Sequence, residues 1–183
     1  MKIQLFWVLA LAAPILAGLD CHWLEEITQD GKGIAFEDHS IWHVHPQSRL
    51  RLENWTKGDQ LKIYPNLASF SSTSFPYCIA NQTKKTRPIH ATLKLGPQKS
   101  NVNTTWIQKI ALAELHITLQ TGKGHTTEWL IEEKDSQMLT NWKPCEGIVI
   151  GNNEGSLAWW FSSCEYILIN VNRGEWLRAT NIH

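Results

Sequence analysis

The residues of this sequence that could bind a metal ion gather near position 40. His43 and His45 alternate along a predicted strand, so both imidazoles would point to the same face. Glu37, Asp38 and His39 come just before them and could supply further ligands. Imidazole and carboxylate groups in such a set are enough to hold a divalent transition metal.

Motifs for catalysis are missing elsewhere. The sequence contains no Gly-x-Ser-x-Gly, no His-Glu-x-x-His, no phosphate-binding glycine loop and no dinucleotide fingerprint. Carboxylate pairs such as Glu25–Glu26 and Glu132–Glu133 are adjacent, so on a strand they point to opposite faces and cannot share a substrate. We therefore predict a protein that is not an enzyme and needs no cofactor. The alternative is a hydrolase whose active-site residues are dispersed along the sequence.

The chain has four cysteines, which allow three disulfide pairings. If residues 146–151 and the strand around residue 162 form a hairpin centred between residues 154 and 155, Cys145 lies opposite Cys164, and Cys21 is left for Cys78. The competing interpretations are free thiols in the core or a lipidated Cys21. Lipidation is not expected, because Asp20 stands where a lipoprotein signal needs a small residue. A zinc site is not expected either, because no two cysteines are close in sequence.

The second half of the sequence repeats the first. Trp42 and Trp55 are 13 residues apart, and so are Trp129 and Trp142, at an offset of 87. Other landmarks keep the same order in both halves: His22–Ile27 matches Thr105–Ile110, Asn54–Asp59 matches Asn141–Glu146, Tyr77–Asn81 matches Tyr166–Asn170, and Ala91–Thr92 matches Ala179–Thr180. This order predicts a tandem duplication, with one module at 21–95, a Gly-, Pro- and Asn-rich linker at 96–104 and a second module at 105–183.

The duplication bears directly on the histidines. His43 corresponds to Leu130 and His45 to Glu132. A position that takes leucine in one copy is expected to face the core, and one that takes glutamate is expected to face solvent. We therefore predict that no metal is bound.

Each module is predicted to be all-β. Alternating segments such as Leu61–Ile63 and Leu115–Leu119 are typical of strands, and turn residues recur at short spacing. This pattern indicates a barrel or sandwich of about five short strands. One helical turn is predicted in each copy, at Ser48–Asn54 and Asp135–Asn141, with Ser48 and Asp135 as N-caps.

The segment from Trp55 to Ile63 reads Trp-x-x-Gly-Asp-x-Leu-x-Ile and resembles SH3-like small barrels, in which a Gly-Asp turn opens the next strand. The second copy departs from this pattern, with Cys145-Glu146 in place of Gly58-Asp59. The order of Trp, Trp, Gly-Asp, Asn, Tyr-x-x-x-Asn and a closing Ala-Thr is similar to that of uncharacterised small secreted proteins of chlamydia-related bacteria, which carry it twice. This resemblance implies an exported bacterial protein and supplies no catalytic residues.

The tryptophans are assigned two roles. Six recur at matched places and are predicted to fill the two cores, because each buried indole removes about 150–250 Å² of surface from water: Trp23, Trp42, Trp55, Trp106, Trp129 and Trp142. Trp159, Trp160 and Phe161 are consecutive, so on a strand their rings point to both faces and at least one is hard to bury. These three residues are the predicted binding site.

Composition and the N-terminus limit the partners and the compartment. Lys plus Arg and Asp plus Glu both total 17, so no basic excess favours nucleic acid. Residues 1–18 contain a 13-residue apolar run that ends in small residues, which predicts a signal peptide, and no transmembrane segment is expected after it. We therefore expect a secreted or periplasmic protein that presents its surfaces to a protein, peptide or glycan. The alternative is a secreted inhibitor or host-directed effector that uses the loop Leu67–Ser74.

Overall fold

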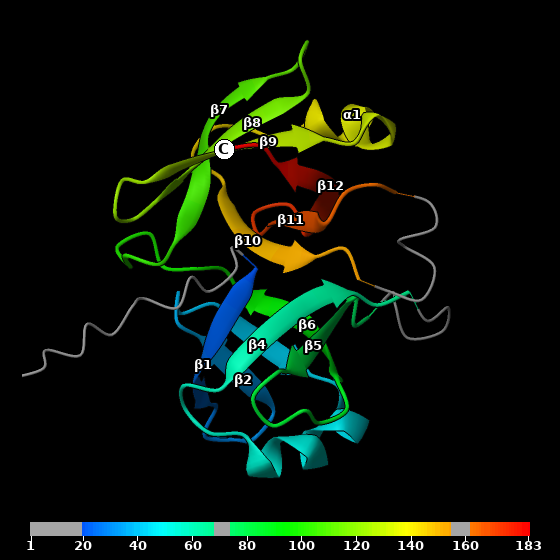
Figure 1. Ribbon diagram of the computed structural model, residues 1–183. Helices are drawn as coiled ribbons and strands as arrows, with labels where there is room; N and C mark the ends of the chain where they lie inside the picture. Colours follow the sequence, from blue (N-terminus) through cyan, green and yellow to red (C-terminus); the bar gives the residue numbers. More distant parts are fainter. Residues whose placement is uncertain (1–19, 68–73, 155–161) are drawn as a thin grey trace, which may run out of the picture.

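The computed structural model describes residues 20–67, 74–154 and 162–183. Two closed, all-antiparallel barrels follow one another along the chain (Figure 1). Barrel 1 contains β1 (Cys21–Ile27), β2 (Gly33–Phe36), β3 (Ile41–Val44), the 3-10 helix η1 (Pro46–Asn54), β4 (Gln60–Pro65), β5 (Tyr77–Asn81) and β6 (Ile89–Leu95). Barrel 2 contains β7 (Thr105–Ala111), β8 (His116–Thr121), β9 (Thr126–Ile131), η2 (Glu133–Asp135), α1 (Ser136–Leu139), β10 (Gly147–Asn152), β11 (Tyr166–Asn170) and β12 (Glu175–Asn181).

The two barrels share one topology. The strand order is β1-β2-β3-β6-β5-β4 in barrel 1 and β10-β11-β12-β9-β8-β7 in barrel 2, which is the same ring traced in the opposite direction. The prediction of duplicated small all-β barrels is confirmed, with six strands in each barrel where about five were expected. The linker 96–104 joins β6 to β7.

The tryptophan pair that is 13 residues apart occupies equivalent places in both barrels. Trp42 and Trp129 are completely buried, and Trp55 and Trp142 are each only 4% exposed. The ring of Trp42 meets the edge of Tyr77 at 5.4 Å between centroids. Its counterpart Trp129 meets Tyr166 in the same way at 5.3 Å. These edge-to-face pairs are favourable beyond their buried area, so each core is organised around the same two aromatic rings.

Trp23 and Trp106 do not fill the cores, so their predicted role is wrong. Trp23 is 36% exposed and Trp106 is half-buried, whereas their neighbours Leu24 and Ile107 are buried. Strand alternation allows only one of two adjacent side chains to face inward. In both copies the aliphatic residue takes that place and the indole lies on the outer face.

The Gly-Asp turn explains how the second copy tolerates its different sequence. The Asp59 carboxylate accepts hydrogen bonds from the Thr56 N–H at 2.9 Å and the Asn81 amide at 2.8 Å. Glu146 accepts from the Lys143 N–H at 2.9 Å and the Asn170 amide at 2.7 Å. One carboxylate therefore ties the turn to the neighbouring strand in each barrel.

The residue before that carboxylate has a left-handed backbone in both copies. Gly58 has φ +85° and Cys145 has φ +67°. Their N–H groups donate to the carbonyls of Leu24 and Ile107, each at 2.8 Å. Glycine adopts this conformation without steric cost, whereas Cys145 keeps it through the same hydrogen bonds.

The barrels pack together through one apolar face of barrel 2. Val149, Ile167 and Ile169 are buried and belong to the same hydrophobic cluster as the core of barrel 1. The backbones approach most closely at Gly151, where an added Cβ would lie 2.7 Å from the carbonyl oxygen of Ile63. The two modules therefore share a hydrophobic core and are not connected by the linker alone.

The predicted disulfides are not formed, and all four cysteines carry free thiols. In the β10–β11 pair Asn152 lies opposite Tyr166, which is not the register of a hairpin centred between residues 154 and 155. Cys145 consequently lies far from Cys164 along the ladder. Cys21 pairs with β4, and β4 separates it from Cys78 on β5. Two strand spacings exceed the Cα separation that a disulfide can span.

Candidate functional site

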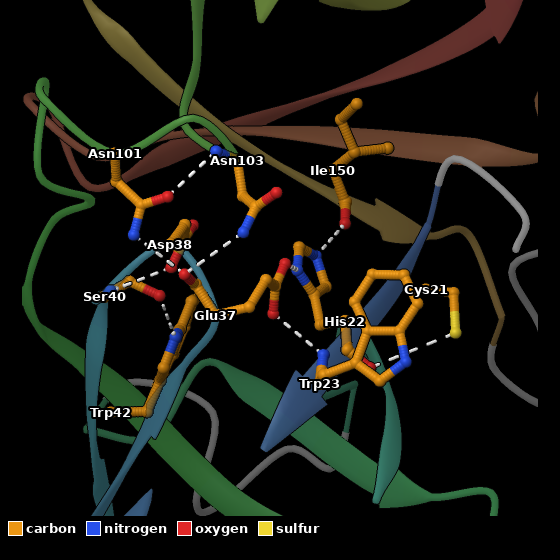
Figure 2. Close-up of polar contacts among 10 residues, drawn as sticks. All are labelled: Cys21, His22, Trp23, Glu37, Asp38, Ser40, Trp42, Asn101, Asn103 and Ile150. Carbon is orange, nitrogen blue, oxygen red and sulfur yellow. Dashed lines mark hydrogen bonds and ion pairs between the residues drawn. The ribbon is translucent and has the colours of Figure 1, made fainter. Parts of the chain in front are cut away.

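A buried histidine joins the two barrels (Figure 2). His22 lies on β1, and its ring stacks on Phe36 with 5.0 Å between centroids. Its Nδ1 is 2.9 Å from Glu37 Oε1, and its Nε2 is 2.8 Å from the carbonyl oxygen of Ile150 on β10. The second oxygen of Glu37 accepts the backbone N–H of Trp23 at 2.8 Å.

The surroundings of His22 favour its charged form. Burial alone would lower the pKa of His22, but the charge and hydrogen bond of Glu37, the charge of Asp38 and the Ile150 carbonyl raise that pKa to about 9. The imidazolium holds the pKa of Glu37 below its ordinary value despite burial. Both ring nitrogens of His22 therefore carry protons and donate hydrogen bonds. Neither nitrogen is free to take a proton from a substrate, so this group acts as a clamp between the barrels and not as a base.

The linker is fixed against the same corner. The Asn101 side-chain amide donates to the Glu37 carbonyl at 2.8 Å, and its oxygen accepts the N–H of Asn103 at 2.8 Å. The N–H of Gln98 donates to the Asp38 carbonyl at 3.0 Å. Figure 2 shows these asparagines beside the turn that carries Glu37 and Asp38. The composition of this segment predicts a linker, and hydrogen bonds hold that linker in one conformation.

The two outward-facing indoles each line a cavity beside the linker. Trp23 borders a cavity of about 250 Å³ whose walls include charged and titratable groups from both barrels, among them Glu37, Lys123 and His125. Trp106 borders a larger cleft of about 390 Å³. The walls of that cleft come from the linker, β7, the start of β10 and the β11–β12 turn: Gly96, Pro97, Lys99, Thr104, Trp106, Cys145, Gly147, Val171 and Asn172.

The chemistry of the Trp106 cleft is simple. Lys99 is the only charged side chain among its wall residues. The side-chain oxygen of Asn172 accepts the N–H of Gly147 at 2.8 Å, so the donors that this side chain can offer a ligand are its amide N–H groups. The Thr104 hydroxyl donates to the Gln98 carbonyl. The cleft thus combines one aromatic face with a few hydrogen-bond donors, which is the usual composition of a small-ligand site.

Other predicted site residues are placed as follows. His43 and His45 are half-buried around Phe75, with ring centroids 6.2 Å and 4.7 Å from it. Within the described ranges, no three His, Cys, Asp or Glu residues are arranged to hold a metal ion. Trp159, Trp160 and Phe161 lie outside the described residues, as do residues 68–73 of the loop Leu67–Ser74.

Sequence reasoning missed both His22 and the outer role of Trp106. His22 corresponds to Thr105 in the second copy, so the duplication itself marks this position as special to barrel 1. The recurrence of Trp23 and Trp106 was visible, but recurrence alone does not distinguish a core position from a surface one.

Comparisons of the chain with protein families, with curated proteins and with solved structures found no match. In the part of the chain that the structure describes, no helix has the length and hydrophobicity needed to cross a bilayer.

Proposed function

We propose that this chain is an exported, non-enzymatic binding protein whose principal ligand is a glycan held in the Trp106 cleft. The observation that carries this proposal is the position of the third tryptophan pair. Two matched pairs of indoles are buried, whereas Trp23 and Trp106 lie on the outer face beside cavities. A large aromatic ring on an outer face adds nothing to its own core, which supports a role in contact with a ligand.

The cleft suits a saccharide for three reasons. Its volume of about 390 Å³ falls in the range of small-ligand sites. The electron-rich face of an indole attracts the weakly positive C–H groups on one side of a sugar ring. The Asn172 amide and the Lys99 ammonium can donate to sugar hydroxyls. The hydrogen bonds from Asn101 and Gln98 to the carbonyls of Glu37 and Asp38 support this function, because a fixed linker keeps the cleft walls in place before binding.

The test is binding of the chain to an array of oligosaccharides, followed by calorimetry with the best of them. Replacing Trp106 with alanine removes roughly 80 Å² of apolar contact, which corresponds to about 2 kcal/mol or a loss of roughly thirtyfold in affinity. The matched control is Trp23→Ala, which removes the equivalent indole of barrel 1. Trp23 borders a different cavity that shares no wall residue with the Trp106 cleft, so this variant is expected to leave the affinity unchanged.

Two results would contradict the proposal. Saccharide binding that survives Trp106→Ala would exclude this cleft as the site. Binding of peptides but of no saccharide, with the same dependence on Trp106, would keep the cleft and replace the ligand class.

A further inference from the structure

The two barrels differ sharply at one equivalent corner, where the helical turn after β3 or β9 meets β6 or β12. In barrel 2 this corner is an ion-pair cluster. Arg178 donates to both oxygens of Asp135, at 2.9 Å and 2.6 Å, and its Nε is 3.1 Å from Glu132 Oε2. One guanidinium is thus matched by two carboxylates from its own barrel.

The backbone shows that barrel 1 has the same corner. The N–H of His45 donates to the His90 carbonyl at 2.8 Å, as the N–H of Glu132 does to the Arg178 carbonyl at 3.0 Å. The N–H of His90 donates to the Ser48 hydroxyl at 3.3 Å. In barrel 2 the equivalent bond runs from the N–H of Arg178 to Asp135 at 2.8 Å. His45, Ser48 and His90 therefore stand where barrel 2 has Glu132, Asp135 and Arg178.

Barrel 1 lacks these carboxylates, and its two arginines at this corner, Arg49 and Arg51, have no basic counterpart in barrel 2, where Ser136 and Met138 stand. The rings of His45 and His90 are 6.4 Å apart. Arg51 donates to the carbonyl of Pro88, just before β6, and Arg49 donates to the Val44 carbonyl at 3.3 Å. Within the described residues no ion pair joins either arginine to a carboxylate. Burial, His45 and Arg51 together lower the pKa of His90.

An exposed apolar side chain lies between the two arginines in the sequence. Leu50, between the two arginines on η1, is 77% exposed, the largest value among the exposed large hydrophobic residues of the described chain. Its counterpart in barrel 2 is Gln137. The cyan coil of η1 lies at the end of barrel 1 farthest from barrel 2 in Figure 1, so neither the other barrel nor the linker covers it.

We infer that this corner of barrel 1, formed by His45, Arg49, Leu50, Arg51 and His90, is a docking surface for an acidic peptide segment of a partner protein. The partner supplies the carboxylates that Glu132 and Asp135 supply within barrel 2. Charge complementarity identifies the occupant, because a guanidinium binds a carboxylate through charge-assisted hydrogen bonds. Leu50 adds an apolar contact that a free small anion could not use. This surface is separate from the Trp106 cleft, so each can fail without the other.

The experiment measures the affinity of the chain for a short peptide with two glutamates around a leucine, against the same peptide with glutamines. The glutamate peptide is expected to bind at least tenfold more tightly at low salt, and the difference should shrink as salt rises. Arg51→Gln and Arg49→Gln should each weaken its binding, Arg51→Gln by at least tenfold. Lys143→Gln removes an exposed charge from barrel 2 and should change nothing.

The sharpest variant rebuilds the corner of barrel 2 in barrel 1. His45→Glu combined with Ser48→Asp gives barrel 1 its own carboxylates and should abolish binding of the acidic peptide. The single arginine variants keep the test valid if this double variant does not fold. Equal binding of the glutamate and glutamine peptides, or unchanged binding by both arginine variants, would overturn the inference. Tight binding of inorganic phosphate without binding of the peptide would also overturn it, in favour of a small-anion site.

Discussion

Raising the pH should loosen the contact between the two barrels, because the buried His22 imidazolium loses its proton. The pKa of His22 in the folded chain is about 9, against 6.5 for an ordinary histidine. A group whose folded pKa is raised contributes all of its stabilisation below the unfolded pKa and loses it as the pH rises through the folded value. The difference corresponds to roughly 3 kcal/mol, of which about 2 kcal/mol should disappear between pH 6 and pH 8.5.

The assay is urea unfolding of the wild-type chain and of His22→Gln across that pH range. The pH range ends at 8.5, below the ordinary thiol pKa of 9.0. The buried Cys78, whose pKa is raised to about 11, therefore adds little to the pH dependence of stability in this range. The stability advantage of the wild type over His22→Gln should shrink by about 2 kcal/mol across the window. His90, whose lowered pKa acts in the opposite direction near pH 6, is present in both chains and cancels in this difference. His183→Gln, which alters an exposed histidine, should follow the wild type. Equal pH dependence of the wild type and His22→Gln would refute a charged His22 as the clamp.

Two further predictions concern packing and thiols. Gly151→Ala should destabilise the chain by roughly 2 kcal/mol, because the new Cβ would lie 2.7 Å from the Ile63 carbonyl oxygen; a urea midpoint equal to the wild type would contradict this close approach. Alkylation without reductant, followed by mass spectrometry, should modify all four cysteines after unfolding. In the folded chain the exposed Cys145 should react first and Cys78 last, because Cys78 is buried and its pKa is raised; the reverse order would contradict the structure.

Landmarks that repeat in the sequence were sufficient to predict the architecture. The spacing of Trp42 and Trp55 and its copy correctly located the core of each barrel. The sequence also shows that Cys145 replaces the turn glycine Gly58 in the second copy. It does not show why the fold accepts this cysteine, because the turn is held by a hydrogen bond from the Cys145 N–H to the Ile107 carbonyl. Residues that repeat at matched positions predict the core because both copies bury the same kinds of side chain in the same barrel.

Hairpin register could not be predicted, because turn-forming residues occur inside the ladder. Asn152 and Asn153 belong to a segment that reads as a turn, yet Asn152 pairs with Tyr166 and the N–H of Asn153 donates to the Glu165 carbonyl at 2.9 Å. The disulfide prediction failed with that register. His22 was missed for a related reason: its partner carbonyl is 128 residues away, and no local pattern marks it.

The contact between the barrels can be traced to two strands of barrel 2 whose sequences do not alternate between apolar and polar residues. In barrel 2 the strand centres read Ile148–Ile150 and Ile167–Ile169, apolar at every position, as expected for strands buried on both faces. The corresponding segments of barrel 1 are Leu61–Ile63 and Cys78–Ala80, where Lys62 replaces Val149. Only barrel 2 therefore carries the apolar outer face. The barrels therefore cannot pack symmetrically, and the clamp at His22 is asymmetric too, because its counterpart in barrel 2 is Thr105.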